Sequence, residues 1–347
     1  MKKFLILLTA VILVSACSTD FKLTTKYKEV MVVYGLLNQS EQDHYLRIHR
    51  GYQDKNESAL KFAVNPDSIY YPDILEVTIS EIKNGQTLRK WTLERIDGDT
   101  LQPPISKDSG TFVRHPNILY HFRATLNPDF DYELKIVNTE TGKVIRSSTR
   151  LVGDFNVQFP NARFAIPWTA PNQYRINWSN AKNSKIYDLN VEVHYSLADV
   201  SKPTQKVRQE SFRWTVFRNK AFNTAEPLYV IPFESFLQAV KVSLDPDPSV
   251  VRYLDSLDFT FTVGTPDFAD YINFSIARSG ITQDQIGTGF TNIEGGYGIF
   301  SARYDKTVTG VRLNSQSLDS LACGSKTGDL QFAPSGPAAY PSWPFCD

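Results

Sequence analysis

Apolar residues at every second position predict β-strands along most of this chain. A near-continuous apolar run at 30–37 has the length of one buried strand. Apolar and polar residues then alternate in four further segments, 44–50, 75–79, 118–122 and 132–136. A period of two buries one face of each strand and leaves the other face in contact with water.

The spacing of these strands is typical of a β-sandwich. About seven strands fall within about 120 residues, and turns that contain glycine separate them. The segment 132–149, a strand, a Thr-Gly turn and a strand rich in Ser and Thr, resembles the last hairpin of an immunoglobulin or fibronectin-type domain. We therefore predict an N-terminal β-sandwich over residues 30–152.

A second series of alternating segments predicts a second β-sandwich over residues 160–306. Its strands are expected at 173–178, 185–195, 209–218 and 256–263. Trp178 and Tyr187 resemble the core aromatic pair of fibronectin type III domains. The predicted fold class is therefore all-β, with two sandwich domains joined by a short linker.

One or two helices are expected as insertions in the second domain. Pro232 stands in the first turn of an apolar stretch that ends at Val240. Thr265 can cap another helix, Pro266 suits its first position, and Gly280 can end it. The apolar stripe of this second helix is Phe268, Tyr271, Ile272 and Ile276.

The first residues of the chain predict an export signal and an anchor. Two lysines precede an apolar core of about eleven residues, about half the length that a transmembrane helix needs. The quartet from Val14 to Cys17, Val-Ser-Ala-Cys, resembles the lipobox of bacterial lipoproteins, in which the cysteine thiol takes a diacylglyceryl group. We predict a signal peptide at 1–16, lipidation at Cys17 and a polar tether at 17–29. The alternative is an ordinary cleaved signal whose cysteine is incidental.

An anchor with several acyl chains, palmitate among them, would hold the mature protein firmly, since one chain alone binds membranes only marginally. Removal of the signal leaves a net charge of about −2 without any basic stripe, which argues against a nucleic-acid partner. No later apolar run approaches the length of a membrane span. The 22 Phe, 17 Tyr and 5 Trp residues favour an exported all-β protein.

Two cysteines remain beyond the anchor, Cys323 and Cys346, in a segment at 307–347 that is rich in Gly, Ser and Pro. We predict this segment to be a tail without regular structure. An exported chain meets an oxidising compartment, so we expect the two thiols to pair, adding about 3 kcal/mol of stability. The alternative is two free thiols in a loose tail. Without neighbouring histidines the cysteines do not suit zinc.

No arrangement of residues in the sequence points to catalysis, a metal or a cofactor. The five histidines match no metal-binding pattern, and His44 and His49, five residues apart on a strand, must point to opposite faces. No Gly-x-Ser-x-Gly motif is present. The glycines between 287 and 298 match no phosphate-binding motif and predict a tight loop before a strand at 297–304.

The segment from Asn292 to Ser301, Asn-Ile-Glu-Gly-Gly-Tyr-Gly-Ile-Phe-Ser, carries a family resemblance. Together with the lipobox and the strand at 32–37, it resembles a large family of Bacteroidota outer-membrane lipoproteins of unknown function, over about residues 17–310. The resemblance implies β-sandwich domains and, as a partner, a TonB-dependent transporter encoded nearby. It implies no catalytic residues, and it does not extend to the tail with its two cysteines.

We therefore expect a lipoprotein anchored in the outer membrane that acts as a non-catalytic binding or accessory subunit of a transporter or envelope assembly. One alternative is an envelope enzyme that acts on glycans through two carboxylates distant in the sequence. Another is a structural or adhesive surface protein that makes contact through exposed aromatic residues. The sequence leaves open which face of the outer membrane the protein occupies.

Overall fold

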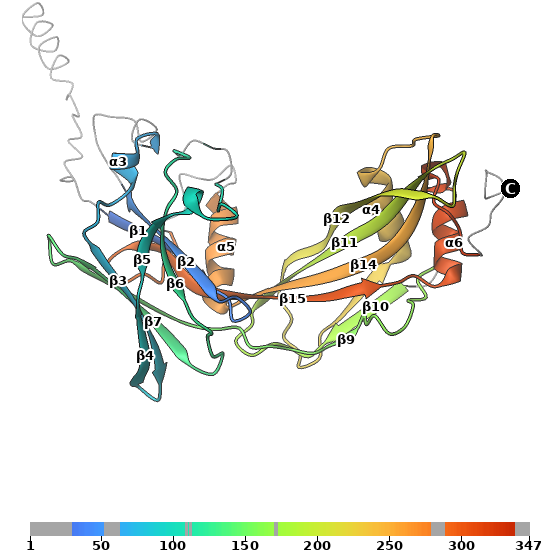
Figure 1. The fold of residues 1–347 in the computed structure, drawn as a ribbon. Coiled ribbons are helices and arrows are strands. Elements are labelled where there is room, and N and C mark those ends of the chain that lie inside the picture. The colour runs from blue at the N-terminus through green and yellow to red at the C-terminus, as the bar shows by residue number, and fades with distance from the viewer. Residues whose placement is uncertain are drawn as a thin grey trace, which may run out of the picture.

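The computed structural model describes residues 30–51, 63–107, 110, 113–169, 173–278 and 289–336. Two lobes lie end to end, and each is a β-sandwich (Figure 1). The fold class is all-β, as the alternating pattern predicted. No described helix is long and apolar enough to cross a membrane.

In the first lobe, five strands of one sheet face a separate sheet of four. The five are, in spatial order, β15 (Tyr297–Val311), β1 (Val30–Leu37), β2 (Asp43–Gly51), β6 (Ile118–Arg123) and β5 (Glu94–Asp97). The four are β4 (Gln86–Thr92), β3 (Leu75–Lys83), β7 (Asp131–Asn138) and β8 (Val144–Arg150). The short helix α3 (Pro66–Ile69) and the 3-10 turn η1 (Gly98–Thr100) lie in connections between strands.

The core of the first lobe lies between these sheets. Val77 and Ile79 of β3 and Leu134 and Ile136 of β7 pack in one cluster with Val33 of β1, and each is at most 1% exposed. Burial of such a side chain stabilises the fold by about 1.5–3 kcal/mol. The alternation read from the sequence therefore identified the buried faces correctly.

The predicted last hairpin is present as β7 and β8, which pair antiparallel. Tyr132, near the start of β7, fixes the corner before it: its hydroxyl accepts a hydrogen bond from the Asn127 amide at 2.7 Å and donates one to Glu81 Oε2 at 2.9 Å. A tyrosine in this position is a hallmark of immunoglobulin-type sandwiches. The Glu81 side chain is almost fully buried, and the Arg89 guanidinium also binds it.

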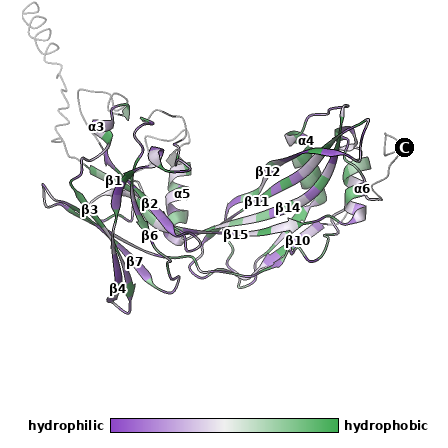
Figure 2. Ribbon diagram, viewed as in Figure 1, coloured by the Kyte–Doolittle hydropathy of each residue, from purple (hydrophilic) through white to green (hydrophobic). Residues whose placement is uncertain are grey.

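The second lobe packs a long sheet against a short one. The long sheet contains β12 (Lys206–Lys220), β11 (Ile186–Asp199), β14 (Val250–Gly264) and the second half of β15. The short sheet contains β13 (Leu228–Pro232), β10 (Gln173–Trp178) and β9 (Val157–Phe159). The helices of this lobe are α4 (Phe233–Ser243), α6 (Ser315–Cys323) and the 3-10 turn η3 (Gly328–Leu330). Figure 2 shows hydrophobic and hydrophilic bands alternating along β11 and β14.

Aromatic side chains fill the core of the second lobe. Trp178 and Tyr187 are fully buried, with ring centroids 5.6 Å apart, which confirms the expected core pair. Trp168 stacks on Phe236 of α4 at 4.9 Å, and its indole Nε1 donates to the Ile231 carbonyl at 3.0 Å. These contacts attach α4 and the short sheet to the same cluster.

Strand β15 belongs to both lobes. Its first residues, 297–302, pair in parallel with β1, and its later residues pair antiparallel with β14. One eight-stranded sheet therefore runs through the whole molecule, and β15 is the strand that continues from one lobe into the other (Figure 1).

The predicted boundary of the second domain at 306 does not match this arrangement. After Gly264 the chain leaves the second lobe, and α5 (Pro266–Arg278) packs on the first: the Tyr271 ring lies 6.4 Å from that of Tyr34. The cap at Thr265 is present, and its hydroxyl accepts from the Phe268 amide. The predicted stripe is only partly right, because Ile276 is 56% exposed. Gly280 lies outside the described residues.

The prediction of an unstructured tail at 307–347 is wrong for its described part, which reaches residue 336. Strand β15 continues to Val311, α6 follows, and Leu321, Leu330 and Phe332 join the core of the second lobe. The helix begins where the Asn314 side chain accepts a hydrogen bond from the Ser317 amide. The apolar residues here are too sparse to produce a visible period, yet each one meets the core.

Candidate functional site

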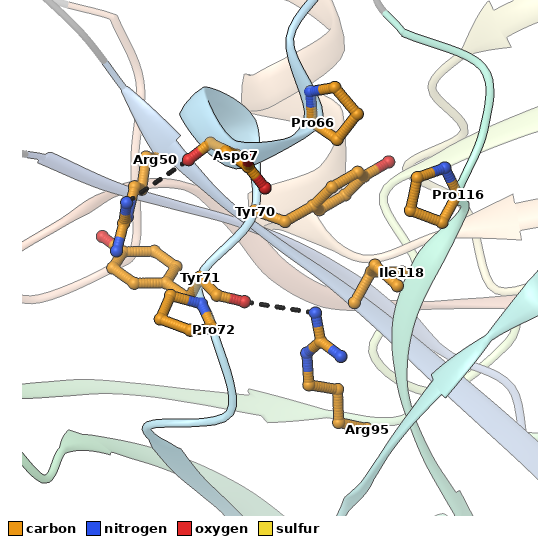
Figure 3. A pocket seen from close by; sticks show the side chains of 9 residues that line it. All are labelled: Arg50, Pro66, Asp67, Tyr70, Tyr71, Pro72, Arg95, Pro116 and Ile118. Atoms are coloured by element: carbon orange, nitrogen blue, oxygen red, sulfur yellow. Dashed lines mark hydrogen bonds between the residues drawn. The ribbon is translucent and has the colours of Figure 1, made fainter.

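A pocket lies at one end of the first lobe, and we call it the mouth pocket. It has a volume of about 350 Å³. Its lining consists of Arg50, Pro66, Asp67, Tyr70, Tyr71, Pro72, Arg95, Pro116 and Ile118 (Figure 3). Two guanidinium groups, one carboxylate and a set of rigid apolar and aromatic faces therefore surround one space.

Strand geometry explains why two arginines point into this end of the sandwich. Arg50 follows Ile48 at the end of β2, so the two side chains leave the strand on the same, core-facing side. Arg95 of β5 is opposite Tyr120, which is buried between the sheets. Both arginines thus stand where the apolar core gives way to solvent, and both are half-buried.

The segment before β3 holds each guanidinium in place. The Arg50 guanidinium lies over the Tyr71 ring, 4.7 Å from its centroid, and its Nη1 is 3.5 Å from the Asp67 carbonyl oxygen. Arg95 Nη2 donates to the Tyr71 carbonyl at 3.3 Å. The Tyr120 hydroxyl, on the residue opposite Arg95, also interacts with this guanidinium group. The site therefore holds one preorganised cation.

Helix α3 sets the position of Asp67. Asn65 caps the helix by accepting a hydrogen bond from the Asp67 amide at 3.0 Å, and Pro66 occupies the first turn. Figure 3 shows the Asp67 carboxylate directed toward the interior of the pocket near the Tyr70 ring. Lys107 donates to the Tyr70 hydroxyl at 3.0 Å, which fixes the ring from the other side.

Burial changes the pKa of Tyr120, the residue opposite Arg95. Burial raises the pKa of Tyr120 to about 12, and the nearby Asp73 carboxylate acts in the same direction, while Arg95 opposes both. Tyr120 therefore stays neutral at physiological pH. The formal charge of the lining is positive, because two guanidinium groups face one carboxylate.

The chemistry of this lining suits binding. A glycosidase needs two carboxylates that flank one bond, and Asp67 is the single carboxylate in the lining. A nucleophilic mechanism needs a hydroxyl, thiol or amine beside a base; the hydroxyls of this lining are those of Tyr70 and Tyr71, and it contains no serine, cysteine, lysine or histidine. Charged groups on apolar walls instead match the general form of a small-molecule binding site.

Other hollows in the described chain are more polar. One of them, about 680 Å³, lies on the outer face of the four-stranded sheet, where Lys90, Lys135 and Arg146 are mixed with Glu133 and Glu294. Positive and negative side chains lie side by side in this hollow, so their charges largely cancel. We therefore take the mouth pocket as the candidate site.

The predicted lipidation site, Cys17, lies outside the described residues, and so does Cys346. Cys323 is the last residue of α6, is exposed, and takes part in a disulfide bond. The identity of its partner as Cys346 stays a prediction. The tether at 17–29 also lies outside the described residues, and β1 starts directly after it.

The histidines of β2 point to opposite faces, as predicted. His44 is buried on the core side and its Nε2 lies 3.0 Å from the Ala124 carbonyl. His49, on the other side, packs edge-on against Tyr70, with centroids 5.5 Å apart. Burial, together with the nearby charges of Arg47 and Lys107, lowers the pKa of His49 to about 4. No group of three or more metal-binding side chains forms within the described ranges.

The Asn-x-Glu-Gly-Gly-x-Gly-x-Phe segment is a structural brace, as the tight-loop interpretation predicted. The Asn292 side chain bonds both backbone groups of Phe300, at 2.7 and 3.0 Å, which closes the loop on itself. Glu294 pairs with Arg146 at the edge of β8. The loop thus connects the four-stranded sheet to β1 of the facing sheet.

Comparison with known proteins gives only distant likenesses. No family model and no curated protein matches the chain. Among solved structures, the C-terminal globular domain of an oligosaccharyltransferase from Pyrococcus abyssi is similar at 10% identity and a TM-score of 0.21, over 65% of this chain and 45% of that one. The N-terminal four immunoglobulin domains of Dscam1 isoform 4.44 are similar at 11% identity and a TM-score of 0.15, over 69% of this chain and 50% of that one. The chain thus matches about half the length of either structure.

No feature of the sequence pointed directly to the mouth pocket. Arg50 could have been noticed, because it occupies an inward position of an alternating strand, where an arginine is unusual. The segment Asn65-Pro66-Asp67 has the pattern of a helix cap, but it does not show what the helix faces. Arg95 lies in a strand of four residues, too short to reveal an inward face.

Proposed function

We propose that this protein is a lipid-anchored lipoprotein of the outer membrane and acts as a non-catalytic binding or accessory subunit. The observation that carries the proposal is the mouth pocket, in which two half-buried guanidinium groups lie beside one carboxylate and apolar walls. The lipobox at Cys17 and the family resemblance of the Asn292–Ser301 segment support the anchor and the compartment.

The position of the pocket is consistent with this role. Val30, the first residue of β1, is paired with Gly51, so the tether enters the fold beside Arg50. A tether over residues 17–29 spans at most about 45 Å when fully extended. The pocket would therefore stay close to the membrane and to any transporter embedded in it.

The anchor is tested by metabolic labelling with an alkyne analogue of palmitate in a bacterial host that lipidates its own exported proteins. The wild-type chain should take the label and sediment with membranes, whereas Cys17→Ser should lose both properties. Cys323→Ser is the matched control and should keep the label. A wild-type chain that is exported without label would contradict the anchor.

The accessory role is tested in the native membrane by chemical cross-linking, detergent extraction and affinity purification of the intact lipoprotein. We expect a TonB-dependent transporter or another envelope assembly to be recovered in a stable ratio. Recovery of the protein alone, from membranes in which it is abundant, would count against an accessory subunit and would leave the anchor intact.

A further inference from the structure

We infer that the mouth pocket binds a small organic acid that carries a carboxylate and, on the same molecule, a hydroxyl or ammonium group. The inference deepens the proposed binding function and rests on it. It names a ligand chemistry that two kinds of molecule share, a sugar acid and a short peptide or amino acid. Four features of the pocket lead to it: the Arg95 guanidinium group, the single carboxylate, the size and the walls.

The first feature is the Arg95 guanidinium group. Its Nη2 donates to the Tyr71 carbonyl at 3.3 Å, and the group is half-buried opposite Tyr120. A half-buried cation has lost part of its hydration, and an incoming oxyanion would restore hydrogen bonds to it. Carboxylates bind guanidinium groups through planar pairs of hydrogen bonds, so a carboxylate suits this position well.

The second feature is Asp67. Its carboxylate faces the same space as the two arginines (Figure 3). A compact anion such as phosphate or sulfate would bring its charge close to this carboxylate and be repelled. A ligand that places its acid near Arg95 and a hydroxyl or ammonium near Asp67 would satisfy both ends. The pocket therefore favours a molecule with two different polar ends over a simple anion.

The third feature is size. A volume of about 350 Å³ is near the lower limit for ligand pockets in proteins. It admits one sugar ring or a dipeptide. The part of the ligand that enters the pocket is therefore no larger than this.

The fourth feature is the walls. Pro66, Pro72 and Pro116 have fixed backbone torsions, and Ile118 is buried at the start of β6. Rigid apolar faces of this kind pack against the C–H face of a sugar or a short aliphatic side chain without losing conformational entropy. The pocket is thus preorganised on its apolar as well as on its charged side.

The test is a titration of the purified, detergent-solubilised lipoprotein, followed by calorimetry and ligand-observed NMR. The probes are D-galacturonate, alanyl-alanine, D-galactose, inorganic phosphate and cyclohexanecarboxylate. We expect saturable binding of D-galacturonate or alanyl-alanine with a Kd of about 1 mM or tighter. D-Galactose lacks the acid, phosphate lacks the separate donor, and cyclohexanecarboxylate lacks the hydroxyl, so each should bind at least about tenfold more weakly. Whichever of the first two probes binds more tightly identifies the source of the ligand.

Two variants make the result specific to the pocket. Arg95→Gln should raise the Kd of the better ligand about tenfold or more. Asp67→Asn should abolish the preference over cyclohexanecarboxylate, and it reports independently if Arg95→Gln fails to fold. Arg175→Gln removes an exposed arginine of β10 in the other lobe and should leave every Kd unchanged.

Three results would overturn the inference: neither acid binds, phosphate binds as tightly as the acids, or Arg95→Gln and Arg175→Gln behave alike in folded protein. None of them bears on lipid labelling or on recovery of a membrane partner. Failure of the ligand assignment is therefore distinguishable from failure of the proposed function.

Discussion

Replacement of Gly298 by Ala should disrupt the parallel pairing of β1 with β15. Gly298 is paired with Val33 and has a φ of +100°, a conformation that side chains other than glycine rarely adopt. A Cβ at this position would lie 2.9 Å from the Val33 carbonyl carbon and 3.0 Å from its nitrogen, and closer still to its carbonyl oxygen. These atoms belong to the backbone of a strand that is paired on both sides, so they cannot move aside cheaply.

The expected cost is the sum of two effects. The left-handed conformation costs a non-glycine residue about 1–2 kcal/mol. Relief of the clash requires β15 to move away from β1, which breaks one or two ladder hydrogen bonds worth about 1 kcal/mol each and loosens the packing of Phe300. We expect a total loss of about 3–5 kcal/mol in the free energy of unfolding, a large fraction of the roughly 5–15 kcal/mol that holds a typical domain.

Gly142→Ala is the matched control. Gly142 lies in the turn between β7 and β8 with a φ of +69°, and a Cβ there would meet nothing within 4 Å. The Gly142→Ala variant should therefore lose only the contribution of the backbone conformation, about 1–2 kcal/mol in the free energy of unfolding. Urea unfolding followed by circular dichroism gives the midpoint and slope for each variant. Equal midpoints for Gly298→Ala and Gly142→Ala would refute the argument that β1 and β15 approach too closely for any side chain.

Three further outcomes follow from other contacts. Tyr132→Phe should lower the free energy of unfolding by about 1–3 kcal/mol, because buried Glu81 loses a hydrogen-bond donor; urea unfolding at pH 7 measures it, and a loss below about 0.5 kcal/mol would contradict it. His49 has a pKa of about 4 in the folded state, below the unfolded value of about 6.5, so the unfolded chain binds more protons between these values and stability should fall as the pH drops from 6.5 to 4. His49→Phe should flatten that slope in urea titrations, and an unchanged slope would exclude His49 as its source. Peptide mapping without reductant should recover Cys323 linked to Cys346, and a reduced Cys346 peptide would rule the pairing out.

The strands of this protein could be predicted from the sequence because their signal is local. The run at 30–37 coincides with β1, and the alternation at 256–263 places Leu257, Phe259, Phe261 and Val263 inside, all fully buried. β4 was not recognised, since every residue of this edge strand is exposed or half-buried and no period appears. A strand at the edge of a sheet has one partner and little core contact, so sequence alone marks it weakly.

The lobes and the candidate site were decided by contacts between distant residues. Nothing near Gly298 in the sequence shows that it lies against Val33, and nothing near Leu330 or Phe332 shows that they enter a core. The mouth pocket likewise depends on the end of β2, a helix of four residues and a short β5 meeting at one end of a sandwich. Burial patterns within a strand arise from chain geometry and can be read locally. Which strands pair, and which polar groups are left facing one space, is set by the packing of the whole chain.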